Sequence, residues 1–123
     1  CWKITQHKKA DDFIIATGKQ YTVKNFIERC FKYLDIKIKW SGSSVNEVAR
    51  IVKYDQNRYP HFKKNMKVIK IDKKYFRPNE VENLIGDYSK SKRVLKWKPK
   101  TTINDLIKEM IDNDIYISKK LLR

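Results

Sequence analysis

Two segments of the chain carry apolar residues at the spacing of one helix face, which predicts two amphipathic helices packed on a core. The first follows Thr22, whose side-chain oxygen is suited to cap a helix. Its apolar residues are Val23, Phe26, Ile27, Cys30, Phe31 and Leu34. The second follows Thr102, which together with Asp105 resembles a capping box. Its apolar residues are Ile103, Leu106, Ile107, Met110, Ile111 and Ile115.

Shorter apolar segments predict strands. Residues 13–17 form a continuous apolar run closed by Gly18, which is typical of a strand buried on both faces. In residues 36–40 large apolar side chains alternate with lysines, which predicts a strand with one solvent-exposed face. Residues 68–71 predict another short strand, and residues 49–54 are a weaker candidate. The order strand, helix, strand indicates an α/β fold with few short strands and amphipathic helices.

The length of 123 residues suits one small domain, and we expect a single domain over 1–123. Two cysteines, Cys1 and Cys30, are too few for a disulfide framework, and Cys30 lies on an apolar helical stripe, where it is expected to pack as a reduced thiol. No run approaches the roughly 18 apolar residues of a membrane span, and no secretory leader opens the sequence. We therefore expect a cytoplasmic protein without a membrane partner.

The formal charge of +15 raises the possibility of a small basic nucleic-acid-binding module, since lysines neutralise phosphates and aromatic rings stack on bases. Against this, lysine far outnumbers arginine and the lysines are scattered along the sequence rather than gathered on one stripe. Isoleucine and asparagine are also plentiful, as A+T-rich coding would produce in any protein. The distribution favours a solvated surface, and nucleic acid is the alternative partner.

Several kinds of catalytic site find no support in the sequence. His7 and His61 are far apart without further ligands at metal-binding spacing, and the three glycines stand singly rather than in a phosphate-binding loop. No serine has a nucleophile motif around it. Pairs of tyrosine and lysine four residues apart occur at Tyr33/Lys37, Tyr59/Lys63, Tyr88/Lys92 and Tyr116/Lys120, as expected by chance where lysine is so common. We expect neither a metal nor a catalytic residue in this chain.

The densest chemistry lies in residues 74–87. Arg77 precedes Pro78, which biases it toward an extended backbone, and a guanidinium at a strand end or loop edge can fork onto a phosphate. Glu80 follows where proline can begin a helical turn, so that one cation and one carboxylate would face the same space. The structural alternative is a surface salt bridge, which contributes only about 0 to 1 kcal/mol.

Two stretches of the sequence carry a resemblance to a known family. They are Ile15-Ala16-Thr17-Gly18-Lys19-Gln20-Tyr21-Thr22-Val23 and Tyr75-Phe76-Arg77-Pro78-Asn79-Glu80-Val81, the latter followed by Leu84, Gly86-Asp87, Lys90, Leu95 and Trp97-Lys98-Pro99. In order and spacing they resemble the C-terminal part of the GDP-mannose 4,6-dehydratases. The resemblance is weakest between Ser43 and Lys67, and the family commonly has proline where Lys73 and Tyr88 stand.

The resemblance implies a role for the chain. Members of the family are extended short-chain dehydrogenase/reductases, with an N-terminal Rossmann domain that binds NADP and a small C-terminal domain that binds the nucleotide sugar. Residues 1–123 would be that C-terminal domain, with Arg77 on the GDP diphosphate and Glu80 accepting hydrogen bonds from the ribose hydroxyls. The complete enzyme would be a homo-oligomeric lyase converting GDP-mannose to GDP-4-keto-6-deoxymannose. Its catalytic residues and NADP site would lie outside this chain, which alone is expected to be inactive; an enzyme for another nucleotide sugar is the nearest alternative.

Overall fold

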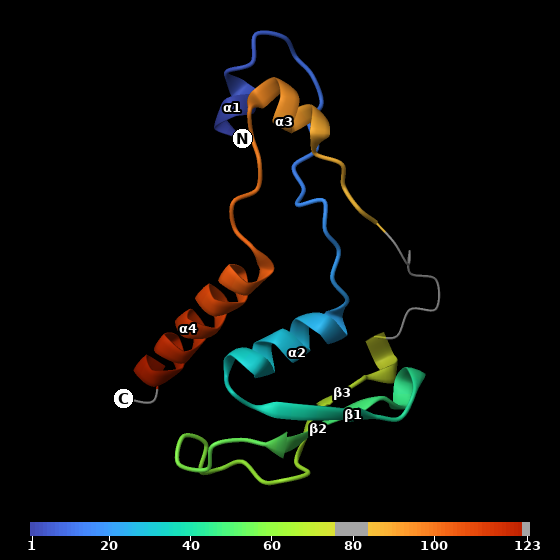
Figure 1. The fold of residues 1–123 in the computed structure, drawn as a ribbon, viewed down its shortest axis with the longest axis vertical. Helices are drawn as coiled ribbons and strands as arrows, with labels where there is room; N and C mark the ends of the chain where they lie inside the picture. The colour runs from blue at the N-terminus through green and yellow to red at the C-terminus, as the bar shows by residue number, and fades with distance from the viewer. Residues whose placement is uncertain (76–83, 122–123) are drawn as a thin grey trace. The chain divides into compact units, whose positions relative to one another are not determined.

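The computed structural model describes residues 1–75 and 84–121 of the chain, which divide into two compact units (Figure 1). Unit 1 comprises Cys1–Tyr21 and Val81–Ile103, and unit 2 comprises Thr22–Glu80 and Asn104–Arg123. Unit 1 contains the helices α1 (Trp2–Thr5) and α3 (Ser89–Leu95). Unit 2 contains the helices α2 (Val23–Tyr33) and, except for its first residue, α4 (Ile103–Leu121), the strands β1 (Lys37–Ser41), β2 (Val48–Lys53) and β3 (Lys67–Lys70), and the short 3-10 helices η1 (Ser44–Asn46) and η2 (Lys73–Tyr75).

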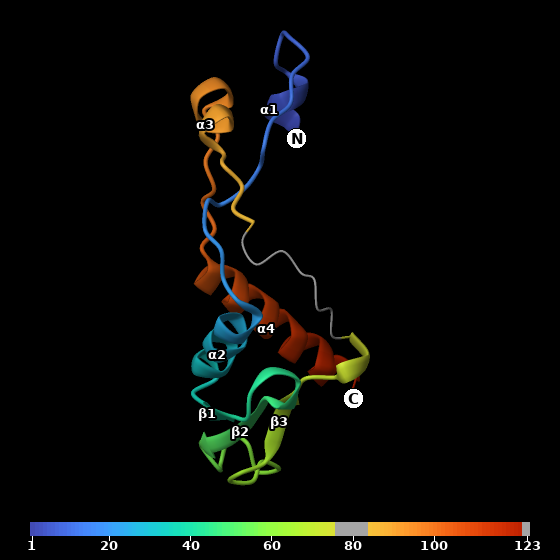
Figure 2. The same ribbon diagram turned by 90° about the vertical axis from the view of Figure 1, so that its right-hand side faces the viewer.

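Unit 2 is built on a three-stranded antiparallel sheet with strand order β1-β2-β3. Ile38 pairs with Ile51 across the first two strands, and Ala49 pairs with Ile69 across the second and third. Helix α2 lies on one side of this sheet in both views, with α4 beside it (Figure 2). Among the described residues of unit 2, the buried apolar side chains are Ile36, Ala49, Ile51 and Ile107. The core therefore joins the sheet to the helices through few residues.

Several predicted elements are confirmed. Helix α2 begins after Thr22, whose Oγ1 accepts a hydrogen bond from the backbone N of Asn25 at 3.1 Å. The second amphipathic helix begins at Ile103 and extends beyond the predicted stripe to Leu121. Strand β1 alternates exposed and half-buried residues as predicted, β3 forms at the strand predicted for residues 68–71, and β2 forms at the weaker candidate segment 49–54. The signals that succeeded were local ones: a cap, a helical period and an alternation.

The predicted strand at residues 13–17 is wrong. These residues form no strand, and Ile14 and Ile15 are 56% and 52% exposed. A strand buried on both faces needs neighbouring strands to pair its backbone groups, and the described part of unit 1 contains none. The predicted strand, helix, strand order is replaced by an antiparallel sheet that lies wholly in unit 2.

Unit 1 holds residues 13–17 by contacts with α3 and the chain before it. Ser91 is fully buried, and its Oγ donates a hydrogen bond to the carbonyl oxygen of Ile14 at 2.6 Å. The carbonyl oxygen of Ser91 accepts from the backbone N of Trp97 at 3.3 Å. Asp87 accepts a hydrogen bond from the backbone N of Ser89 and so supports the start of α3, while Tyr88 takes the cap position.

Replacing Ser91 by alanine is expected to destabilise unit 1 by about 1 to 2 kcal/mol, because the hydrogen bond from the fully buried Ser91 to the carbonyl oxygen of Ile14 is lost. The free energy of unfolding from urea denaturation, followed by circular dichroism, measures the change. Ser118→Ala is the matched control, since it also places alanine in a helix but at an exposed position. Equal stability of the two variants would contradict the importance of the Ser91 hydrogen bond.

Candidate functional site

The predicted pair Arg77 and Glu80 lies outside the described residues, and the structure describes the chain on either side of it. On the N-terminal side, β3 ends at Lys70 and η2 follows, which confirms that a strand precedes the candidate stretch. Asp72 accepts a hydrogen bond from the backbone N of Lys74 at 3.0 Å at the start of η2. Tyr75 is 73% exposed, and the Nζ of Lys74 lies 5.7 Å from the centroid of its ring. This flank presents an aromatic ring and a cation to solvent.

On the C-terminal side, the two sequence stretches that carry the family resemblance meet within unit 1. A Cβ atom added to Gly86 would lie 2.6 Å from the Cβ of Ala16 and 3.3 Å from Cγ2 of Ile14. A Cβ added to Gly18, which has a φ of +68°, would lie 3.1 Å from Cε1 of Tyr88. Glycine at these positions lets the two stretches approach closely. No local pattern in the sequence predicts this contact, although both glycines lie in the stretches that carry the family resemblance.

Charged groups reinforce the same contact. The Nζ of Lys90 donates to Oδ1 of Asp11 at 2.6 Å and lies 5.2 Å from the centroid of the Phe13 ring. This hydrogen bond from Lys90 is the main reason that the pKa of the Asp11 carboxyl falls below its usual value. The pKa of Asp87 is lowered as well, by hydrogen bonds from the side chain and the backbone of Ser89. Unit 1 thus anchors the chain that leads out of the candidate stretch.

Unit 2 contains a groove of about 590 Å³ between α2 and α4. Its lining residues are Asn25, Glu28, Arg29, Lys32, Tyr33, Asn104 and Ile107. Arg29 spans it, donating from Nε to Oδ1 of Asn25 at 2.7 Å and from Nη1 to Oδ1 of Asn104 at 2.9 Å. Amides and charges of both signs line the groove, so it suits a polar ligand or serves as a polar helix contact.

Further along the two helices, the hydroxyl of Tyr33 donates to Oδ1 of Asp112 at 2.8 Å, and Nζ of Lys108 donates to Oδ2 at 2.8 Å. The hydrogen bond from Lys108, followed by that from Tyr33, lowers the pKa of Asp112 below its usual value. The same contacts with Asp112 raise the pKa values of Tyr33 and Lys108. The cluster links α2 to α4 most strongly while the carboxylate is ionised.

The pH dependence of this link has a definite sign. Because the pKa of Asp112 is lowered in the folded protein, its contribution is complete above the unfolded carboxyl pKa of about 3.9 and is lost as pH falls through the lowered pKa. Asp112→Asn is expected to remove this small acid-dependent loss, which urea denaturation from neutral to acidic pH measures. Asp114→Asn, at an exposed position of the same helix, is the control. Identical pH profiles for wild type and Asp112→Asn would contradict the role of the cluster.

Neither the Tyr33/Lys37 pair nor the Tyr116/Lys120 pair has the geometry of an acid/base site. Tyr33 ends α2 while Lys37 begins β1, as predicted for a pair that spans a helix end. Tyr116 and Lys120 do share a helix, but Nζ of Lys120 lies over the ring face, 4.9 Å from its centroid. A cation over the ring face is a cation–π contact rather than a hydrogen bond to the hydroxyl.

In residues 1–75 and 84–121, no group of three or more histidine, cysteine or acidic residues is placed to hold a metal ion. No helix in the same ranges is long and apolar enough to cross a membrane.

Cys1 and Cys30 are both free thiols, and burial raises the pKa of the Cys30 thiol, in agreement with its predicted packing as a reduced side chain.

The described residues define a small mixed α/β protein with a basic, aromatic flank before its candidate site. The family model for GDP-mannose 4,6 dehydratase matches residues 1–110. The GDP-mannose 4,6 dehydratase of Dictyostelium discoideum is 41% identical over 115 residues, covering 93% of this chain and 29% of the relative. The corresponding proteins of Vibrio cholerae and Homo sapiens are 37% and 35% identical, covering 97% and 96% of this chain and 32% and 29% of their own lengths.

The chain therefore belongs to the GDP-mannose 4,6-dehydratase family, which confirms the resemblance seen in its sequence. It spans about three tenths of the length of these curated relatives. The match contains the stretch with Arg77 and Glu80 as well as the Gly86 and Ser91 contacts of unit 1.

Proposed function

We propose that this chain is the nucleotide-sugar-binding part of a GDP-mannose 4,6-dehydratase of the extended short-chain dehydrogenase/reductase type. The observation that carries the proposal is the family match over residues 1–110, which contains both predicted ligand-binding residues. Arg77 pairs with the diphosphate, because a planar guanidinium matches two phosphate oxygens. Glu80 accepts from the ribose hydroxyls, because one carboxylate has acceptor sites for both groups of a vicinal diol.

The remaining functions of the enzyme fall to sequence beyond this chain. NADP supplies the hydride chemistry of such an enzyme, and its site requires a glycine-rich loop after a strand. The glycines here stand singly at positions 18, 42 and 86, so the residues present do not fit that cofactor. This chain holds and orients the nucleotide. Oxidation, loss of water and reduction of the sugar take place on the N-terminal half that the family places outside this chain. A homo-oligomer in the cytoplasm is proposed for the complete enzyme on the same family basis.

The proposal is tested by isothermal titration of the purified chain with GDP, GDP-mannose and, as a control for the base, UDP. Binding of both guanosine ligands in preference to UDP is expected. Absence of GDP binding, with circular dichroism showing the chain to be folded, would contradict the proposal.

A separate measurement addresses catalysis. The purified chain incubated with GDP-mannose and NADP is expected to form no 4-keto-6-deoxy sugar, because it carries neither the cofactor loop nor the catalytic residues that the family places in its N-terminal half. Product detected by chromatography above a boiled-protein control would overturn this prediction of inactivity.

A further inference from the structure

The sheet of unit 2 gathers basic residues that look scattered in the sequence. The basic residues of its three strands, called here the cationic cluster, are Lys37, Lys39, Arg50, Lys53, Lys67 and Lys70. Lys39 is the cross-strand partner of Arg50, and Arg50 is the partner of Lys67, so three cations form a row across the sheet. Lys37 is likewise opposite Lys53. The antiparallel register therefore creates a concentration of charge that no single segment displays.

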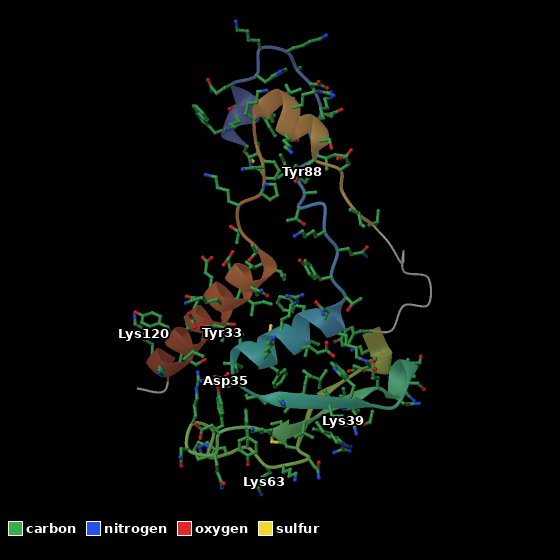
Figure 3. All side chains as sticks on the ribbon, viewed as in Figure 1. Tyr33, Asp35, Lys39, Lys63, Tyr88 and Lys120 are labelled. Atoms are coloured by element: carbon green, nitrogen blue, oxygen red, sulfur yellow. The ribbon has the colours of Figure 1, made fainter. Side chains whose placement is uncertain are left out.

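The row lies on the side of the sheet away from α2. Ile38 and Trp40 of β1 are half-buried, and Nζ of Lys24 on α2 lies 4.8 Å above the Trp40 ring. Side chains alternate along a strand, so Lys39 points to the opposite side (Figure 3). The five lysines of the cluster are exposed, while Arg50 is half-buried and donates to the carbonyl oxygen of Asn65 at 3.0 Å. Most of the charge is therefore open to solvent.

No acidic residue balances these charges within the strands, which contain neither aspartate nor glutamate. The ion pairs recorded among the described residues of unit 2 are Lys24–Glu47, Arg58–Asp35 and Lys108–Asp112, and none uses a member of the cluster. Like charges directly opposite each other destabilise a sheet. The bare sheet therefore carries repulsion that a bound polyanion would relieve.

The loop between β2 and β3 places aromatic rings beside further cations. Tyr59 stacks on Phe62 with ring centroids 5.2 Å apart, and the guanidinium of Arg58 lies 5.4 Å from the Tyr59 centroid. The hydroxyls of Tyr54 and Tyr59 donate to the carbonyl oxygens of Phe62 and Leu34, which fixes both rings. Lys63, in the same loop, is exposed (Figure 3). Rigid rings beside cations are a common composition of surfaces that bind single-stranded nucleic acids.

We propose that the cationic cluster binds the phosphate backbone of a single-stranded nucleic acid, a function beyond the nucleotide-sugar site. Along β1, the alternate residues Lys37 and Lys39 are about 7 Å apart, which is comparable to the phosphate repeat of an extended nucleotide chain, and the row across the sheet supplies further cations beside them. The ammonium group of lysine is a point charge on a flexible stem, so several lysines can each contact one phosphate of a repeating backbone. Bidentate recognition of a single carboxylate would instead favour arginine. A second copy of this chain does not fit the cluster, since each copy carries a formal charge of +15.

The competing structural explanation is that lysines on β1 and β3 merely protect exposed sheet edges from aggregation. That explanation accounts for Lys37, Lys39, Lys67 and Lys70, but β2 is the central strand and needs no such protection. Arg50 of β2 is nevertheless the middle cation of the row, between Lys39 and Lys67. Protection of sheet edges therefore does not explain Arg50.

The test measures binding of a fluorescein-labelled oligothymidine to the whole chain by anisotropy across a series of salt concentrations. Six phosphate contacts predict a slope of about −4 for log K against log salt on a single strand. The triple variant Lys37→Gln, Lys39→Gln, Lys67→Gln is expected to bind at least tenfold more weakly, with a slope of about −2. The triple variant with arginine at these positions keeps the charge and is expected to keep the affinity.

The matched control is Lys92→Gln, Lys98→Gln, Lys100→Gln, which removes three exposed lysines from unit 1. An equal loss of affinity in this control would overturn the proposal, because net charge alone would then explain binding. No binding at low salt, or equal binding to poly-glutamate or to phosphatidylserine vesicles, would overturn it as well. The glutamine variant should unfold at no lower temperature than wild type, since it removes like-charge pairs. Titration with GDP should be unchanged in all variants, which separates this proposal from the one above.

Discussion

Replacing Arg77 by alanine is expected to weaken GDP binding between about 10-fold and 150-fold, the equivalent of losing a charge-assisted hydrogen-bonded contact of about 1.5 to 3 kcal/mol. The guanidinium is the group proposed to neutralise the diphosphate, and alanine offers no donor in its place. Isothermal titration with GDP measures the change, and circular dichroism shows that the fold is kept. The effect should fall mainly on the diphosphate, so affinity for guanosine should change little.

Arg93→Ala is the matched control, because Arg93 is an exposed arginine on α3 outside the candidate stretch. Its GDP affinity should equal that of wild type. Glu80→Gln provides a second comparison, since it keeps the shape of the side chain but removes its charge and one acceptor. If Arg77→Ala and Arg93→Ala bind GDP equally well, Arg77 is not part of the site.

Replacing Gly42 by alanine is expected to destabilise unit 2 by about 2 to 4 kcal/mol, the sum of a left-handed backbone penalty and steric overlap. Gly42 follows β1 and has a φ of +84°, a region that L side chains rarely adopt. An added Cβ would lie 2.4 Å from the carbonyl oxygen of Asn46, and a backbone oxygen cannot rotate away. Urea denaturation and hydrogen exchange of the β1 amides measure the loss.

Ser43→Ala is the neighbouring control for this change. Ser43 is exposed, its φ is −144°, and its side chain makes no cap hydrogen bond, so a change within about 0.5 kcal/mol is expected. Comparable protection of the β1 amides in Gly42→Ala and wild type would show that the turn accommodates a side chain, contrary to its geometry.

Local signals predicted the two long helices because a helix is defined by contacts within about four residues. Thr22 and the apolar period after it were sufficient for α2. The same reasoning was wrong for residues 13–17. The apolar run there predicted a buried strand, but it could not identify a neighbouring strand to pair with it. In unit 1 these residues pack instead against Gly86 and Ser91, neither of which carries a local signal for such a contact.

For the candidate site, the sequence predicted which residue types contact the ligand but not their arrangement in space. Arg77 and Glu80 were selected by residue type, by their positions around Pro78 and by family resemblance, and their pairing stays a prediction because they lie outside the described residues. What the structure adds is the support on either side: η2 after β3, and the contact of Gly86 with Ala16. Both depend on how distant segments fold together.

By itself the sequence determined the long helices, the alternation of β1 and membership of the GDP-mannose 4,6-dehydratase family, because each rests on residue types at fixed local spacing. Only the tertiary structure decided which strands are neighbours and in what register. That register places Lys39, Arg50 and Lys67 in one row. The physical reason is that strand pairing joins backbone groups far apart in the chain, and local periodicity specifies which face a side chain takes but not which residue lies beside it.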